Sequence, residues 1–224
     1  MNIRTIINQA FPQSCLLCLG NDGPLCADCR NDLPWQPDTH CPVCALTMAD
    51  GNICGHCLSE PPAFSSTTAL FVYDFPINRL IHQLKYHEQL GLADMLGSLL
   101  AERMRNLPDI WLPMPLHARR LKERGFNQAV EIARALSRQS NIPMHPEWAT
   151  REKDTPPQAG LKRAARRKNM RGAFDCDPRV VGLHIGIVDD VMTTGSTLDS
   201  LASTLMQAGA RTVALRSASP IAAS

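Results

Sequence analysis

Two adjacent aspartates followed by a hydroxyl-rich turn are the residues of this chain best suited to bind a charged ligand. Asp189 and Asp190 end an apolar run, and the turn after them contains Thr193, Thr194, Gly195, Ser196 and Thr197. Adjacent carboxylates repel each other unless Mg²⁺, or the hydroxyl groups of a ribose, satisfy them. Backbone N–H groups at a helix start bind phosphate, and hydroxyl groups add donors. The segment predicts a phosphate site beside a magnesium or ribose site, although helix capping alone also explains the threonines.

A strand and a helix must hold these residues in place. The apolar run 183–188 is typical of a buried central strand, and Leu198, Leu201 and Leu205 recur at helical spacing after the turn. Strand and helix patterns alternate along the chain, which predicts an α/β fold with a parallel sheet and helices on both sides. The other expected strands are 69–73, 109–114, 142–149 and 212–216, and the other expected helices are 77–86, 91–105, 118–139 and 160–169. Ligands of such sheets bind beyond the carboxyl ends of the strands, where the aspartates lie.

A second chemical pattern lies near the start of the chain. Eight of the nine cysteines fall within the first 57 residues, as four Cys-x-x-Cys pairs. Two such pairs can present four thiolates to one zinc ion in a tetrahedral site. The sequence predicts one or two zinc ions, and two are favoured because eight sulfurs saturate two ions. The expected ligands are Cys15, Cys18, Cys26, Cys29, Cys41, Cys44, Cys54 and Cys57.

The order in which the four pairs share the ions is open from the sequence. Sequential pairing is favoured, with the first two pairs on one ion and the last two on the other, while a cross-braced arrangement also fits the spacing. So small a segment has little core, so metal must supply much of its folding energy. Pro61 and Pro62 directly follow this segment and favour an extended linker after it. We therefore expect a zinc-binding module over residues 1–60 and a second domain over 61–224.

The charge of the chain is unevenly distributed. Residues 1–60 hold two basic and six acidic residues, whereas residues 110–172 hold 14 basic and five acidic ones. No apolar run approaches the roughly 18–20 residues that span a bilayer. The first residues are too polar for a secretory signal. Nine cysteines without an export signal indicate free thiols in a reducing compartment, so we expect a cytoplasmic protein without a membrane span.

Residues 187–197 resemble the signature that binds 5-phosphoribosyl-1-pyrophosphate (PRPP) in type I phosphoribosyltransferases. The resemblance implies that Asp189 and Asp190 hold the ribose hydroxyls, with Mg²⁺ bound together with PRPP, and that the turn 193–197 wraps the 5-phosphate. Gly186 departs from the signature, which usually has an apolar strand residue at that position.

Four further segments are similar to the ComF/GntX family. They are Leu84-Lys85-Tyr86 and the residues 124–128, 155–158 and 167–169. The resemblance covers about residues 11–214 and is nearer to the GntX branch. Members are bacterial proteins tied to natural competence and the uptake or use of external DNA. The family implies a type I phosphoribosyltransferase-like parallel sheet joined to an N-terminal, cysteine-rich, double zinc-ribbon-like module.

Basic residues near the expected ligand edge are candidates to contact pyrophosphate or a nucleic-acid backbone. Arginine suits this role because its planar group grips two phosphate oxygens. The basic stretch 151–171 resembles the loop that closes over pyrophosphate in type I phosphoribosyltransferases, although a solvated basic helix has the same spacing. The candidates are Lys85, Arg119, Arg124, Arg151 and Arg167.

Three functions are compatible with these features. The first is a PRPP-binding protein of competence or DNA utilisation that also binds single-stranded DNA and works with other DNA-processing proteins. The second is a nucleobase-salvage phosphoribosyltransferase that releases pyrophosphate. The third is a regulatory or assembly factor that senses PRPP and docks through its zinc module. The catalytic residues and the acceptor are unknown, because the sequence shows no general base and no pocket for a base.

Overall fold

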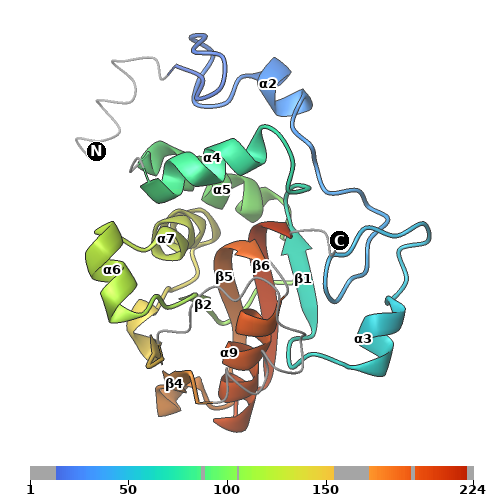
Figure 1. The fold of residues 1–224 in the computed structure, drawn as a ribbon, viewed down its shortest axis with the longest axis vertical. Coiled ribbons are helices and arrows are strands. Elements are labelled where there is room, and N and C mark those ends of the chain that lie inside the picture. The colour runs from blue at the N-terminus through green and yellow to red at the C-terminus, as the bar shows by residue number, and fades with distance from the viewer. Residues whose placement is uncertain (1–13, 87–88, 105, 154–171, 193–194, 221–224) are drawn as a thin grey trace.

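The fold is a four-stranded parallel sheet with helices on both faces, as a computed structural model describes it for residues 14–86, 89–104, 106–153, 172–192 and 195–220. Figure 1 shows the sheet at the centre of the molecule, with the strand order β1-β6-β5-β2. The strands are β1 (Ser66–Ala69), β2 (Ile110–Pro113), β5 (His184–Met192) and β6 (Thr212–Pro220). The predicted α/β fold with a parallel sheet is confirmed.

Alternate residues of the strands pack against different helices. Leu112, Ile187 and Leu215 share a core with α9 (Ser196–Gln207). Their neighbours Trp111 and Val188 face the opposite layer. That layer consists of α4 (Ile77–Tyr86), α5 (Leu90–Glu102) and α7 (Gln128–Ser140). The strand β2 and residues 185–188 of β5 are buried from both sides, which explains why these stretches carry almost no polar side chains.

Several expected elements have other bounds in the structure, and two of them differ in kind. The helix predicted over 118–139 is divided into α6 (Ala118–Arg124) and α7, because Gly125 has a φ of 82° and ends α6. The strand predicted over 142–149 is reduced to a single parallel bridge between Met144 and Trp111, since a short 3₁₀ helix, Pro146–Trp148, begins at the proline. The strand β3 (Ala149–Arg151) follows and pairs antiparallel with β4 (Phe174–Cys176). The helix predicted over 160–169 lies outside the described residues.

Gly186 in β5 has a packing reason to be glycine. A Cβ atom there would lie 2.3 Å from the ring of Trp111, which is fully buried on the neighbouring strand β2. The Trp111 indole N–H donates to the Ser140 hydroxyl at 2.9 Å, which holds the ring in this position. The departure from the signature therefore makes room for a tryptophan and leaves the strand intact.

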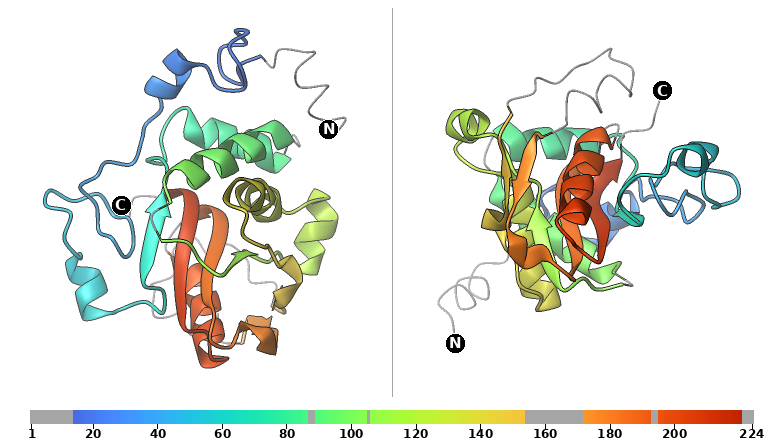
Figure 2. Two further views of the ribbon diagram at one scale, coloured as in Figure 1. Left: turned by 180° about the vertical axis from the view of Figure 1, so that it is seen from behind. Right: turned by 90° about the horizontal axis from the view of Figure 1, so that it is seen from below.

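The cysteine-rich segment packs along the open edge of the sheet. The backbone N–H of Thr67 in β1 donates to the Pro42 carbonyl at 3.0 Å, and the Thr67 hydroxyl donates to the Val43 carbonyl at 2.6 Å. Both ribbon views in Figure 2 and the view in Figure 1 place α3 (Gly55–Ser59) on this side, next to β1. The other short helix of the segment is α2 (Ala27–Asn31). The boundary expected at residue 61 stays a prediction.

None of the described helices is long and apolar enough to cross a membrane.

Candidate functional site: an acidic and basic cleft, and two zinc centres

A cleft of about 700 Å³, including space open to solvent, lies where β5 ends and α9 begins. Asp189 and Asp190 form one side of it, together with Gly195 and Thr197 from the start of α9. Four basic side chains from other elements complete the lining: Lys85, Arg120, Arg124 and Arg151. The cleft therefore brings a carboxylate pair, a helix N-terminus and several cations to the carboxyl edge of the sheet, where ligands of such sheets bind.

Lys85 reaches across from α4 to the acid pair. Its Nζ atom lies 2.6 Å from Oδ2 of Asp190, and the two side chains are 26% and 12% exposed. Low exposure reduces solvent screening, so this ion pair is stronger than one on the open surface. Lys85 thus balances part of the negative charge of the acid pair.

Asp189 remains short of positive charge. Burial, and then the negative charge of Asp190, raise the pKa of Asp189 well above its usual range, although Lys85 acts in the opposite direction. One Asp189 oxygen accepts the backbone N–H of Asp190 at 2.9 Å. A divalent cation or a pair of donating hydroxyl groups would satisfy the remaining carboxylate oxygens. The pair therefore fits Mg²⁺ or the diol of a sugar.

The start of α9 supplies the donors for an anion. Gly195 has a φ of 70° and precedes the first helical residue, so its backbone turns the chain from β5 into the helix. Ser196 is buried, while Thr197 lines the cleft. The helix spans 12 residues, and its positive end suits phosphate. Thr193 and Thr194 lie outside the described residues.

The basic side of the cleft rests on the junction of α6 and α7. The Arg124 guanidinium donates to Oε1 of Gln128 at 2.7 Å, and both residues line the cleft. Asn127 caps α7 by accepting the backbone N–H of Ala129 and donates to the carbonyl of Met114 at 2.9 Å. These bonds fix Arg124 relative to the end of β2.

The structure groups some of the basic candidates and leaves others apart. Lys85, Arg124 and Arg151 line the cleft, whereas Arg119 is exposed and lies 3.5 Å from Glu123. Arg167 lies outside the described residues. Sequence reasoning did not select Arg120 as a site residue, although it lines the cleft. Its spacing of four from Arg124 was the available signal, since residues i and i+4 share a helix face.

The eight paired cysteines form two clusters, and the chain order of the pairs decides the grouping. The first cluster holds Cys15, Cys18, Cys26 and Cys29, and the second holds Cys41, Cys44, Cys54 and Cys57. The four sulfurs of each lie within 4.8 Å of one another. Sequential pairing is therefore confirmed over the cross-braced alternative.

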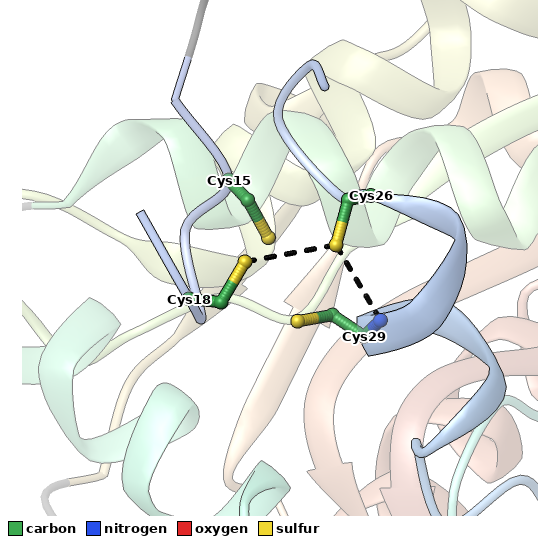
Figure 3. Close-up of side chains that lie close together, drawn as sticks. All are labelled: Cys15, Cys18, Cys26 and Cys29. Atoms are coloured by element: carbon green, nitrogen blue, oxygen red, sulfur yellow. Dashed lines mark hydrogen bonds between the residues drawn. The ribbon is translucent and has the colours of Figure 1, made fainter. Parts of the chain in front are cut away.

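The sulfur positions fit zinc. Tetrahedral Zn–S bonds of about 2.3 Å separate the sulfurs by about 3.8 Å. The Cys18 and Cys26 sulfurs are 3.7 Å apart, as Figure 3 shows for the first cluster. The Cys44 and Cys54 sulfurs are also 3.7 Å apart. Each cluster thus has the ligand number, ligand type and spacing of a structural zinc site.

Backbone donors prepare one thiolate in each cluster. Burial alone would raise the pKa of Cys15, but the backbone N–H groups of Cys18, Cys26 and Leu17 outweigh it and lower the pKa to about 6. Cys41 follows the same rule, and its pKa is lowered to about 7. Thiolate is the form that binds zinc, so each cluster holds a ligand that is ready at neutral pH.

Known proteins match both the cysteine-rich segment and the chain as a whole. Residues 6–58 match the double zinc ribbon domain family. Over 216 residues the chain is 37% identical to the DNA utilization protein YhgH of Escherichia coli O157:H7, and the match covers 90% of this chain and 94% of that protein. It is 30% identical to competence protein F of Haemophilus influenzae, over 89% of this chain and 93% of that protein.

Solved structures show a more distant likeness. The glutamine PRPP amidotransferase from B. subtilis overlaps with a TM-score of 0.42 at 20% identity, over 57% of this chain and 26% of that chain. This likeness is too distant to indicate a ligand. The family assignment rests on the sequence relatives instead. The chain therefore belongs to the ComF/GntX family, together with these DNA utilization and competence proteins.

Proposed function

We propose that the cleft binds PRPP together with Mg²⁺, and that the protein acts in the use or uptake of external DNA. In this proposal Asp189 and Asp190 hold the ribose hydroxyls and the metal, and the 193–197 turn with the start of α9 holds the 5-phosphate. Lys85, Arg120, Arg124 and Arg151 face the pyrophosphate group. The role in DNA use rests on the names of the relatives, DNA utilization protein and competence protein.

One observation carries the ligand proposal. An acid pair, the N-terminus of a helix and four basic side chains line the same cleft at the carboxyl end of β5. PRPP offers the complementary groups, a diol between a monophosphate at one end and a pyrophosphate at the other. A ligand with phosphate alone would leave the acid pair unsatisfied, and a ligand with a diol alone would leave the basic side chains without an anion.

The test is the affinity for PRPP, measured by titration calorimetry with and without Mg²⁺. The double charge reversal Asp189→Lys and Asp190→Lys should abolish binding, because it removes the diol and metal ligands while the zinc content stays unchanged. A matched control is Asp94→Lys with Glu102→Lys, which changes the net charge equally at exposed positions on α5. Retained PRPP binding by the cleft variant would contradict the site.

Binding and turnover are separate questions at this site. The residues of the cleft are of the types that hold phosphate groups and a metal ion. Phosphoribosyl transfer needs little more than this and a correctly positioned acceptor. Release of pyrophosphate from PRPP with a panel of nucleobases would identify a salvage transferase. We propose binding as the function, with turnover decided by that assay.

Single-stranded DNA is the second ligand of the proposal. Arg120, Arg124 and Arg151 line a cleft that includes space open to solvent, and in this proposal they contact the phosphates of the strand. Each phosphate contact releases counterions, and the affinity should therefore fall steeply as salt rises. If the protein does not bind an oligonucleotide at low salt, or if its affinity for the oligonucleotide does not change with salt, DNA is not part of its function.

A further inference from the structure

An exposed aromatic ring lies next to two residues that line the cleft, Lys85 and Arg124. Tyr86 is the last residue of α4 and is 62% exposed, although it directly follows Lys85, which lines the cleft. In Figure 1 the carboxyl end of α4 lies above α6, the helix that carries Arg124. The Tyr86 side chain at the end of α4 therefore contacts Arg124 at the end of α6.

Two neighbours hold the ring without covering it. The Arg124 guanidinium carbon lies 5.8 Å from the centre of the Tyr86 ring, within the range of a cation–π contact. The ring of His82, one helical turn earlier, lies 4.6 Å from it at an angle of 44°. Arg124 is itself tied to Gln128 in the cleft wall. The exposure of Tyr86 shows that much of its side chain stays open to a ligand.

The combination has a recognisable chemistry. Proteins that bind unpaired nucleic acid place aromatic rings and arginine planes for the bases beside positive charge for the backbone. We propose that Tyr86 and Arg124 form a stacking surface for an unpaired nucleobase beside the cleft. The inference rests on the proposed function of the cleft, and it adds that a nucleobase is the chemical group recognised there. The base belongs either to single-stranded DNA or to a free nucleoside.

The first experiment separates base from backbone. The full chain is titrated at low salt with a fluorescent twelve-nucleotide thymidine strand and with an abasic strand of the same length. Tyr86→Ala should weaken binding of the thymidine strand about tenfold and leave the abasic strand unchanged. Tyr86→Phe keeps the ring and should bind as the unaltered chain does. Phe75→Leu removes another exposed ring, 71% exposed and away from the cleft, and should change neither.

The second experiment identifies the source of the base. Tyr86→Trp introduces an indole at the proposed surface, and its fluorescence should be quenched when a base stacks on it. Quenching by thymidine alone assigns the surface to free nucleosides, and quenching by the strand but not by thymidine assigns it to DNA. The abasic strand should not quench in either case.

Three results would overturn the inference. The first is equal loss of the thymidine and abasic strands in Tyr86→Ala. The second is unchanged binding of both strands in that variant together with no quenching of Tyr86→Trp by thymidine. The third is no binding of strand or thymidine by the unaltered chain. PRPP affinity, measured in parallel, keeps the two proposals apart. If Tyr86→Ala binds the base-containing ligand more weakly but binds PRPP normally, both proposals hold. If the unaltered chain binds no PRPP yet shows the Tyr86 effect, the stacking surface stands and the PRPP proposal fails.

Discussion

At the scale of single residues, the acid pair in the last four residues of β5 is a source of instability in the protein without ligand. Asp189 is pushed towards its protonated form by burial and by the charge of Asp190, and Lys85 offsets this in part through its contact with Asp190. Sites that must bind charge often carry such a stability penalty, because the ligand supplies the missing partner. The same residue should therefore respond in opposite directions in stability and in binding.

Asp189→Asn should stabilise the protein without ligand while weakening PRPP binding. The amide has no charge to desolvate, and its oxygen can still accept the backbone N–H of Asp190. We expect the free energy of unfolding at pH 7 to rise by about 1 kcal/mol, measured by urea denaturation. A fall in that free energy would show that the Asp189 charge is satisfied without ligand.

The pH dependence of this gain follows from the direction of the pKa shift. The pKa of Asp189 is higher in the folded protein than its usual value near 3.8, so ionisation favours unfolding. The unaltered chain should lose stability relative to Asp189→Asn as pH rises from about 4 through the raised pKa. The difference should disappear at lower pH, where the carboxyl group is protonated in both states.

The acid pair was predictable from the sequence, whereas the basic wall was predictable in part. Two aspartates after an apolar run lie at the carboxyl end of a strand wherever that strand is placed in a parallel sheet. Arg119 and Arg120 are neighbours in sequence, and the direction of each depends on how α6 is rotated. That rotation depends on the break at Gly125 and on the bond between Asn127 and Met114, which are tertiary features.

At the scale of elements, the close packing of α5 and α7 depends on Gly97. A Cβ atom at Gly97 would lie 2.5 Å from Ala135 Cβ and 2.6 Å from the carbonyl oxygen of Ile132. Neither neighbour is the flexible end of a long side chain, so the helices would have to separate. These helices carry the core beneath the cleft, and α7 begins at Gln128 in its wall.

Gly97→Ala should destabilise the fold by about 1–3 kcal/mol, because overpacking there outweighs the better helix propensity of alanine. Gly91→Ala, in the same helix, is the matched control, since its Cβ would meet Leu16 at an ordinary 3.7 Å. The control should be neutral or more stable by up to about 1 kcal/mol. Chemical denaturation measures both, and equal effects of the two variants would contradict the packing argument.

Helices were easier to predict than strand ends in this chain. The apolar spacing of Ile77, Leu80, Ile81 and Leu84 predicts a helix over 77–86, and α4 has those bounds. The strand expected over 69–73 is found as β1 over 66–69, although the backbone N–H groups of Leu70 and Phe71 still donate to Ser217 and Ala218 of β6. The sequence of an edge strand does not record which residues its neighbour pairs with, so the error lies in the position rather than the type of element.

At the scale of the whole molecule, the zinc-binding segment shields an edge of the sheet. Pro34 and Gln36 bond to the backbone beyond the end of β1, at Val72 and Leu70, and Pro42 and Val43 bond to Thr67. Edge strands invite pairing with other chains unless they are covered. The cysteine spacing predicted the metal sites. It did not predict the contact with β1, because that contact is made by backbone carbonyl groups, which every residue has and which leave no signal in the sequence.

The two zinc sites should therefore contribute unequally to the stability of the molecule. Pro42 and Val43 lie between the ligands Cys41 and Cys44, so zinc bound to the second cluster would fix the loop that bonds to β1. In the first cluster Cys18 is exposed and Cys29 half-buried, whereas three of the four ligands of the second cluster are buried. The sheet edge thus depends on the second ion more than on the first.

Removing the second zinc should lower the melting temperature more than removing the first. The variants are Cys41→Ser with Cys44→Ser, and Cys15→Ser with Cys18→Ser as the matched control. Each should lose one zinc ion by elemental analysis. Loss of two edge hydrogen bonds at about 1 kcal/mol each corresponds to a further decrease of about 4–8 °C for a chain of this size. Equal melting temperatures for the two variants would show that the loop holds the edge of β1 without its metal.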